Sequence, residues 1–175
     1  MHQEAWRWVQ RTALGLARPP FRVLELGSRD VNGSVRNIFR AHGTLFPRYV
    51  GLDIAPGPGV DVVADAATWT PPAGEEPDCV VTTEMLEHVA DAEAVIANVG
   101  RILKPGGVLL LTCATDPRAP HSAIDGGALH PGEHYRNVPA RELQTWLARW
   151  AVRTIVDIYD ERGDLYAFAV KAAPS

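Results

Sequence analysis

Two residues that end short apolar runs could together bind the ribose of a nucleotide. Gly27 follows the run 21–26, and a glycine lets the backbone turn sharply and approach a ligand closely. Asp53 ends the run 49–53 and lies 26 residues after Gly27, a separation at which a carboxylate can bind a ribose diol. Apolar residues at helical spacing follow Gly33. The order of strand, glycine turn and helix start therefore predicts a nucleotide-type site.

Arg29 narrows the choice of nucleotide. In a dinucleotide site this position is a second glycine, because the pyrophosphate needs a bare backbone there. The Arg29 side chain would crowd a pyrophosphate, whereas a cofactor with an adenosine but no phosphates is tolerated better. S-adenosylmethionine (SAM) is such a cofactor, and its methionine carboxylate could pair with Arg29.

Four motifs occur in a set order: VLELGS at 23–28, YVGLD at 49–53, EMLEHV at 84–89 and RILKPGG at 101–107. With them the chain resembles the class I SAM-dependent methyltransferases of the small-molecule type, over roughly 21–174. It departs from the family in the first loop, which usually reads E-x-G-x-G-x-G. Here the loop reads ELGSRDVNG, with its next glycine at Gly33. This departure affects the loop that would contact the methionine moiety.

The resemblance implies a set of cofactor-binding residues. Glu25 would support the methionine end, Asp53 would bind the ribose, and Asp65 would accept from the adenine amine while Ala66 donates to the ring. The alternative is that these carboxylates only cap turns by accepting backbone N–H groups. The residues expected to bind SAM are Glu25, Gly27, Ser28, Arg29, Asp53, Ile54, Asp65, Ala66, Glu84 and Met85.

Three further polar residues stand where the fourth strand of the family ends. Glu84 could line the opening toward the substrate. Glu87 and His88 could instead form a hydrogen-bonded turn that supports the helix beginning after Asp91, and for His88 we favour this structural role.

The polar stretch 114–138 is long for a connection in a compact domain, and such loops are often lids or binding loops. A histidine suits removal of a proton at neutral pH, so His121, His130 and His134 are the candidate catalytic bases. Alternatively, these side chains could bind a divalent metal ion. Their spacing lacks a sharp metal signature, and the stretch 132–147 resembles a segment of small-molecule methyltransferases. We therefore expect substrate contact and no metal.

Alternating strand and helix patterns predict an α/β fold. Strands are expected at 21–26, 48–54, 60–64, 78–82, 108–112, 152–159 and 164–171, and helices at 3–17, at about 33–41, after Asp91 and after Pro139. The short joint 161–163 requires an antiparallel pair. By resemblance this is the doubly wound, seven-stranded, Rossmann-like methyltransferase sheet, mostly parallel with a C-terminal antiparallel hairpin.

The 175 residues suggest an N-terminal helix at 1–20 and a single methyltransferase-like domain at 21–175, with a lid insertion at 114–138. The helix could cover one side of the sheet or cap the ligand, and we favour the first. Cys79 and Cys113 would lie toward opposite ends of neighbouring parallel strands, so we expect two free thiols.

The formal net charge of −4 argues against a nucleic-acid partner. The N-terminus lacks a signal-peptide core, and no stretch reaches 18 apolar residues, which predicts a cytoplasmic protein without membrane association, as a monomer or homodimer. The expected activity is methyl transfer from SAM to an oxygen, nitrogen or carbon atom of a small molecule. A non-catalytic SAM-binding module or partner subunit is the main alternative. A nicotinamide oxidoreductase is opposed by Arg29, and a nucleic-acid methyltransferase by the acidic balance and by TTEM at 82–85.

Overall fold

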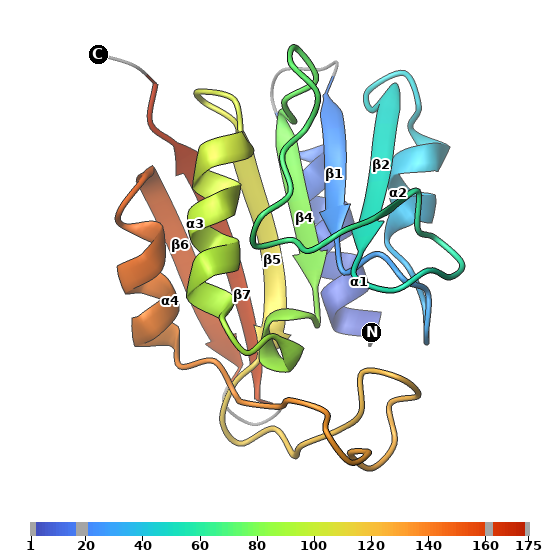
Figure 1. The fold of residues 1–175 in the computed structure, drawn as a ribbon. Helices are drawn as coiled ribbons and strands as arrows, with labels where there is room; N and C mark the ends of the chain where they lie inside the picture. Colours follow the sequence, from blue (N-terminus) through green and yellow to red (C-terminus); the bar gives the residue numbers. More distant parts are fainter. Residues whose placement is uncertain (1–2, 17–20, 160–162, 174–175) are drawn as a thin grey trace.

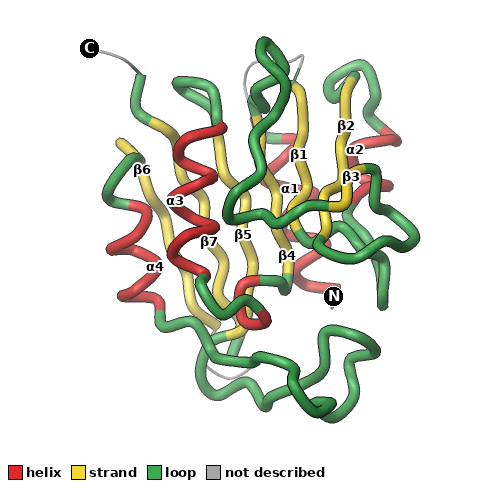
Figure 2. The backbone as a smooth tube through the Cα atoms, in the orientation of Figure 1, coloured by secondary structure: helices red, strands yellow, loops and turns green. Residues whose placement is uncertain are grey.

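The computed structural model describes residues 3–16, 21–159 and 163–173. Seven strands form one sheet in the order β3-β2-β1-β4-β5-β7-β6 (Figures 1 and 2). They are β1 (Arg22–Leu26), β2 (Arg48–Asp53), β3 (Val62–Val63), β4 (Cys79–Thr83), β5 (Val108–Ala114), β6 (Ala151–Tyr159) and β7 (Asp164–Lys171). The pairs β1–β2, β1–β4, β2–β3 and β4–β5 are parallel, and β7 runs antiparallel to both β5 and β6. The predicted fold class is confirmed.

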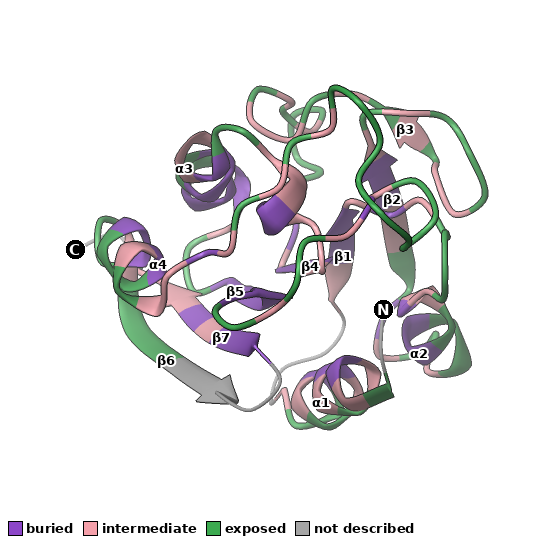
Figure 3. Ribbon diagram, turned by 90° about the horizontal axis from the view of Figure 1, so that it is seen from below, coloured by how far each residue is buried: buried purple, intermediate pink, exposed green. Residues whose placement is uncertain are grey.

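Helices cover both faces of the sheet. Figure 3 shows α1 (Gln3–Leu14) and α2 (Arg36–Ala41) on one face and α3 (Ala92–Ile102) and α4 (Ala140–Leu147) on the other. Val9 and Ala13 of α1 are buried in one hydrophobic cluster with Leu110 of β5. The interpretation that the first helix covers the sheet is therefore confirmed.

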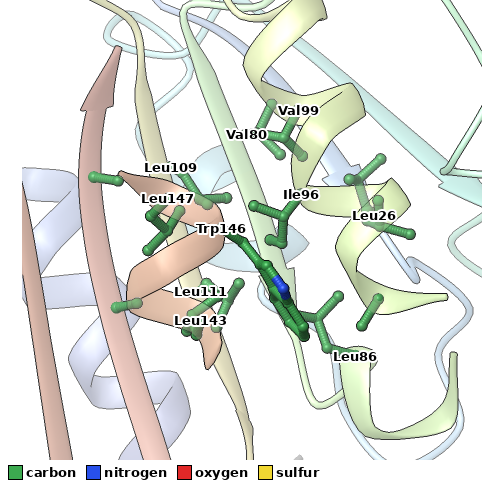
Figure 4. Close-up of a cluster of buried hydrophobic side chains, with 14 of the residues drawn as sticks. Leu26, Val80, Leu86, Ile96, Val99, Leu109, Leu111, Leu143, Trp146 and Leu147 are labelled. Atoms are coloured by element: carbon green, nitrogen blue, oxygen red, sulfur yellow. The ribbon is translucent and has the colours of Figure 1, made fainter. Parts of the chain in front are cut away.

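The larger of the two hydrophobic clusters lies between the sheet and the helix pair α3–α4. In Figure 4, Ile96 of α3 and Trp146 of α4 lie over Leu111 and its neighbours on the sheet. Every residue of β5 is buried, as expected for a parallel strand with helices on both faces. This packing fixes the strand ends, and with them the loops that carry polar side chains.

Several element bounds differ from the sequence-based expectation, most by one residue, and β5 runs two residues beyond its expected end at 112. The helix expected from about residue 33 begins at Arg36, because Gly33 has φ 119°, which no helix accepts. The strand expected at 60–64 is only Val62–Val63, because the amide of Gly51 donates to the Asp61 side chain (2.7 Å) in place of a backbone carbonyl. The first helix ends at Leu14. The expected end at 17 and part of the hairpin joint 161–163 lie outside the described residues.

The two cysteines are free and fully buried, as predicted. Cys79 pairs with Val108 at the start of β5, whereas Cys113 is the penultimate residue of that strand. The parallel register therefore keeps the two thiols toward opposite ends of neighbouring strands.

Candidate active site

Gly27 forms the turn at the carboxyl end of β1. Its backbone has φ 73°, and both its amide and that of Ser28 donate to the carbonyl of Leu52 (2.9 and 3.1 Å). A side chain at this position would lie 2.7 Å from Cγ of Met85. A glycine is required here both by the positive φ and by the Met85 side chain packed above it.

Asp53 joins the loops that follow β1 and β2. One carboxylate oxygen accepts the amide of Arg29 (3.0 Å) and the other accepts the amide of Ala55 (3.0 Å). The turn-capping alternative is therefore part of its role. An ionised carboxylate has about four lone-pair positions, so two remain for a further donor such as a ribose hydroxyl. The next side chain, Ile54, is 75% exposed and offers an apolar surface beside the carboxylate.

Glu25 is buried inside β1 and accepts a hydrogen bond from the hydroxyl of Tyr49 (2.5 Å). Burial raises the pKa of Glu25 to about 7, although the Tyr49 hydrogen bond and the Arg36 charge oppose the shift. The guanidinium of Arg36 lies 4.9 Å above the Tyr49 ring. Sequence reasoning missed Tyr49. Glu25 pairs with Gly51, and Tyr49 lies two residues before Gly51 in the same strand. Alternate residues of a strand share a face, so this spacing was the available signal that Tyr49 lies on the same side of the sheet as Glu25.

Arg29 connects the first loop to the long loop 115–139. Its guanidinium donates to the carbonyl of Ala123 (3.4 Å), and its stem lies where a side chain on Gly57 would fall. A small cavity of about 50 Å³ lies beside it, lined by Glu25, Gly27, Ser28, Arg29, Val31, Asn32, Gly33, Ser34, Thr83 and Glu84. This size suits the charged terminal groups of a ligand more than a whole nucleoside.

Asp65 and Ala66 follow β3 on the outer part of the site. Asp65 is exposed, and its carboxylate accepts the amide of Ala67 (2.8 Å). Ala66 is half-buried, and its carbonyl accepts from the side chain of Asn98 (2.8 Å), a buried residue of α3. The α3 helix thereby holds this loop in place.

Glu84 follows β4 with φ 52°, a backbone conformation that non-glycine residues rarely adopt. Its amide donates to the carbonyl of Thr112 (2.9 Å), and its side chain accepts from the Thr112 hydroxyl (2.8 Å). Arg118, in the long loop, is 3.8 Å from the second carboxylate oxygen. Such strained residues cluster at ligand sites, so Glu84 and Arg118 belong to the candidate site.

The turn Leu86–His88 follows, and its backbone is hydrogen-bonded as expected, with the amide of His88 donating to Met85 (2.9 Å). The carboxyl group of Glu87 is fully buried. Neither of its oxygens has a hydrogen-bond partner among the described residues. Burial, followed by the nearby charge of Glu84, raises the pKa of Glu87 to about 8.

A pocket of about 330 Å³ is lined by residues of the long loop and of the loops that follow β1 and β4. Figure 1 shows the long loop below the ends of β4 and β5. The rings of His88, His121 and Tyr135 meet edge to face near the pocket, with centroids 5.0 to 5.4 Å apart. Burial, together with the nearby His121, lowers the pKa of His88. The pocket is lined by Val31, Asn32, Glu84, His88, Arg118, His121, Ser122, Ala123 and Gly126.

Only one of the three candidate bases lines this pocket. His121 does, whereas the exposed His130 pairs with Asp125 (3.1 Å) and His134 is exposed on the same loop. Sequence reasoning missed Arg118 as a site residue. No local sequence pattern indicates this role for Arg118, because only the fold of the long loop places Arg118 beside Glu84.

The long loop is held at both ends. At its start the amide of Thr115 donates to Gly163 (2.8 Å). At its end the amide of Arg136 donates to the carbonyl of Glu87 (2.8 Å) and that of Val138 donates to Ala114 (2.8 Å). Glu133 accepts from the buried Ser122 (3.0 Å) within the loop. By contrast, every residue of the loop tip, 124–132, is exposed. Among the described residues, no helix combines the length and apolarity needed to cross a membrane.

The chain is similar to several known proteins. A ubiquinone biosynthesis O-methyltransferase of Nitrosococcus oceani is 35% identical over 83 residues, or 43% of this chain and 35% of the relative, so the chain spans about a third of its length. DhpI, whose structure is that of a DhpI–SAH complex, is 25% identical, with TM-score 0.62 over 95% of this chain and 83% of that one.

A Burkholderia thailandensis 1,6-didemethyltoxoflavin-N1-methyltransferase, crystallised with 1,6-didemethyltoxoflavin and S-adenosylhomocysteine, is 18% identical. Its TM-score is 0.66 over 96% of this chain and 78% of its own. The family described as "Methyltransferase domain" matches residues 1–150. Because this match covers most of the 175 residues, and the sheet is that of the class I Rossmann-like fold, the chain belongs to the methyltransferase domain family.

Proposed function

We propose that the chain binds SAM along the carboxyl edge of its parallel strands and transfers the methyl group to a small molecule held under loop 115–139. One observation carries this proposal: the small cavity beside Glu25 and the 330 Å³ pocket share the lining residues Val31, Asn32 and Glu84. A cofactor terminus in the first and an acceptor in the second would therefore be neighbours. Methyl transfer requires that neighbourhood, because the nucleophile must approach the methyl group in line with its bond to sulfur.

The cofactor side combines complementary charges and surfaces. The buried Glu25 would meet the methionine ammonium, Asp53 would use its remaining lone pairs for the ribose, and the exposed Ile54 would pack against the adenine. Asp65 and Ala66, which follow β3, would form hydrogen bonds with the polar edge of the adenine. The DhpI structure, a complex with SAH, and the B. thailandensis structure, a complex with S-adenosylhomocysteine, support this choice of cofactor, because SAH is what SAM becomes once its methyl group has been transferred.

The acceptor side offers His121 as the base. The attacking oxygen, nitrogen or carbon would take the methyl group, the electrons of the carbon–sulfur bond would move to sulfur, and a proton released from a hydroxyl or amine would pass to His121. Arg118 and His88 add hydrogen-bonding groups on the same pocket. The similar proteins named above include an O-methyltransferase and an N-methyltransferase, which supports a small-molecule acceptor.

Calorimetry with SAM and with NAD tests the cofactor assignment. We expect SAM to bind and NAD not to bind, and Asp53→Ala to weaken SAM binding by about 1.5–3 kcal/mol, the scale of hydrogen bonds to a charged group. Asp91→Ala is the matched control, because that exposed carboxylate also caps a backbone amide, that of Ala94 (3.0 Å), but lines neither cavity. We expect it to leave SAM affinity unchanged.

Unchanged SAM affinity in a folded Asp53→Ala variant would remove the ribose assignment, and NAD binding would overturn the proposal. A turnover assay that follows the SAM-derived product over hydroxyl- and amine-bearing acceptors then decides between enzyme and binding module. SAM binding without turnover on any of them would favour the non-catalytic alternative.

A further inference from the structure

Three side chains from two separate loops meet in a way that suits a metal ion. Glu87 and His88 come from the turn after β4, and His121 comes from the long loop. One potential ligand atom from each lies within 4.8 Å of those of the other two. Ligand atoms bonded at about 2.1 Å to one tetrahedral Zn²⁺ lie about 3.4 Å apart, so side-chain movements of about 1 Å would bring all three into coordination.

Glu87 is the strongest reason to expect a cation here. Its side chain is fully buried, and neither oxygen has a hydrogen-bond partner among the described residues. A buried carboxyl group without partners costs several kcal/mol unless a proton or cation compensates it. Nδ1 of His88 is also a buried atom without a partner in the part of the chain that the structure describes. A metal ion would satisfy both groups at once.

His121 is held in a way that suits a ligand. Its Nδ1 lies 3.2 Å from the carbonyl oxygen of Ala119. A neutral imidazole that donates from Nδ1 to this carbonyl keeps Nε2 unprotonated, the arrangement usual for a metal-binding histidine. Edge-to-face contacts with the rings of His88 and Tyr135 fix its orientation further.

We infer that a divalent transition-metal ion of the Zn²⁺ or Mn²⁺ class binds Glu87, His88 and His121. One carboxylate and two imidazoles suit these ions, whereas Mg²⁺ and Ca²⁺ prefer oxygen ligands throughout. His88 and His121 also line the 330 Å³ pocket, so the remaining coordination positions open toward its interior. This site differs from the metal site considered from the sequence, which used only histidines of the stretch 114–138. Here two of the three ligands, Glu87 and His88, lie outside that stretch.

The position of the ion, together with the proposed function on which this step rests, indicates the chemical class of the methyl acceptor. An acceptor whose hydroxyl oxygen coordinates the ion would lose its proton more readily, because a bound cation stabilises the resulting oxyanion. That oxygen would then form the new bond to the methyl carbon while the carbon–sulfur electrons return to sulfur. The proton would leave to solvent, because His121 cannot act as the base while its Nε2 is bound to the ion; the ion would replace it in that role. The inference for the acceptor is thus an O-nucleophile. The metal site itself stands independently of methyl transfer.

The test is a calorimetric titration of chelator-treated protein with Zn²⁺ and, separately, with Mn²⁺, without SAM. We expect one equivalent to bind. His121→Phe keeps a ring against His88 and Tyr135 but removes the nitrogens, so we expect affinity to fall at least tenfold. Glu87→Gln should have an effect of the same size. His130→Ala is the matched control, because His130 lies on the same loop but outside the pocket, and it should leave metal affinity unchanged.

Spectroscopy on the wild type keeps the test independent of variant folding. Bound Mn²⁺ should show coupling to histidine ¹⁴N in electron spin echo measurements. Absence of nitrogen coupling, absence of binding, or equal affinity in wild type and folded His121→Phe would each overturn the site. SAM affinity is measured separately, so failure of SAM to bind would count against the proposed function and leave the metal result intact.

Discussion

Glu25 is the ionisable side chain whose burial most affects the cofactor side of the site. Its pKa of about 7 exceeds the ordinary value of 4.5 because of burial. Between these two pH values the unfolded chain has released the proton and the native chain retains it, so native stability falls as pH rises. The Tyr49 hydrogen bond and the Arg36 charge oppose this shift of the Glu25 pKa, whereas the charges of Asp30 and Asp53 add to it.

We expect Glu25→Gln to remove this pH dependence, since the amide still accepts from the Tyr49 hydroxyl but does not titrate. Relative to wild type, the variant should gain stability between pH 4.5 and about 7, by up to about 3 kcal/mol. Urea unfolding at several pH values measures the difference. Glu87 contributes a slope of the same sign in both proteins, so only the difference counts. Parallel pH profiles for the two proteins would contradict the assignment.

Gly51 shows how closely the loops of the site pack on β2. A side chain at this position would overlap the carbonyl oxygen of Gly59 and lie 2.7 Å from both the Arg36 guanidinium and the Ser28 hydroxyl. We expect Gly51→Ala to lower the free energy of unfolding by about 1–3 kcal/mol through overpacking. Gly43→Ala is the control, because its nearest atom lies 3.7 Å away, and its urea midpoint should stay within error of wild type or rise slightly. Equal midpoints for all three proteins would show that the Gly59 loop yields freely.

At the scale of elements, the loop 115–139 divides into anchored ends and an exposed tip. The amides of Arg136 and Val138 are hydrogen-bonded to the turn after β4 and to the end of β5, whereas all residues of 124–132 are exposed (Figure 3). Stability differs along a chain according to such local contacts. The loop therefore resembles a strap fixed at its two ends more than a freely hinged segment.

Hydrogen exchange should reveal this division. Without ligands, amides of the tip should exchange faster than those of Arg136 and Val138. With SAM and an acceptor bound, protection should increase at the tip more than in α3, because a ligand in the pocket contacts Ala123 and Gly126 directly. Exchange rates are read by mass spectrometry on peptides of each segment. Equal exchange rates at the tip with and without ligands would show that ligands do not order this loop.

At the scale of the whole molecule, the two thiols report on the integrity of the sheet. Cys79 and Cys113 are fully buried in β4 and β5, and burial raises the pKa of the Cys79 thiol to about 12. Because thiolates are the reactive form, neither residue should react while the sheet is intact. We expect a thiol reagent to modify both only at the rate of global unfolding, measured in parallel by circular dichroism. Fast modification of one thiol in protein with a native spectrum would indicate local opening at that strand.

Much of the fold could be predicted because its signals are local. The apolar runs of β1 and β4, the N-cap at Asp91, which accepts the amide of Ala94 (3.0 Å), and the short joint before β7 each lie within a few residues. Periodicity and turn chemistry act over that range. Gly27 and Asp53 each stand at the end of such a local strand pattern. Because neighbouring parallel strands end at the same edge of a sheet, the two residues could be predicted to share one site.

The sequence by itself thus determined the strands, their parallel arrangement and the edge at which polar residues gather. The tertiary structure alone decided that Tyr49 donates to Glu25, that His121 and not His130 lines the pocket, and that Glu87 is buried beside His88. The physical reason is distance along the chain. His88 and His121 are separated by a helix, a strand and a loop, and only the packing of these elements brings their rings to 5.0 Å.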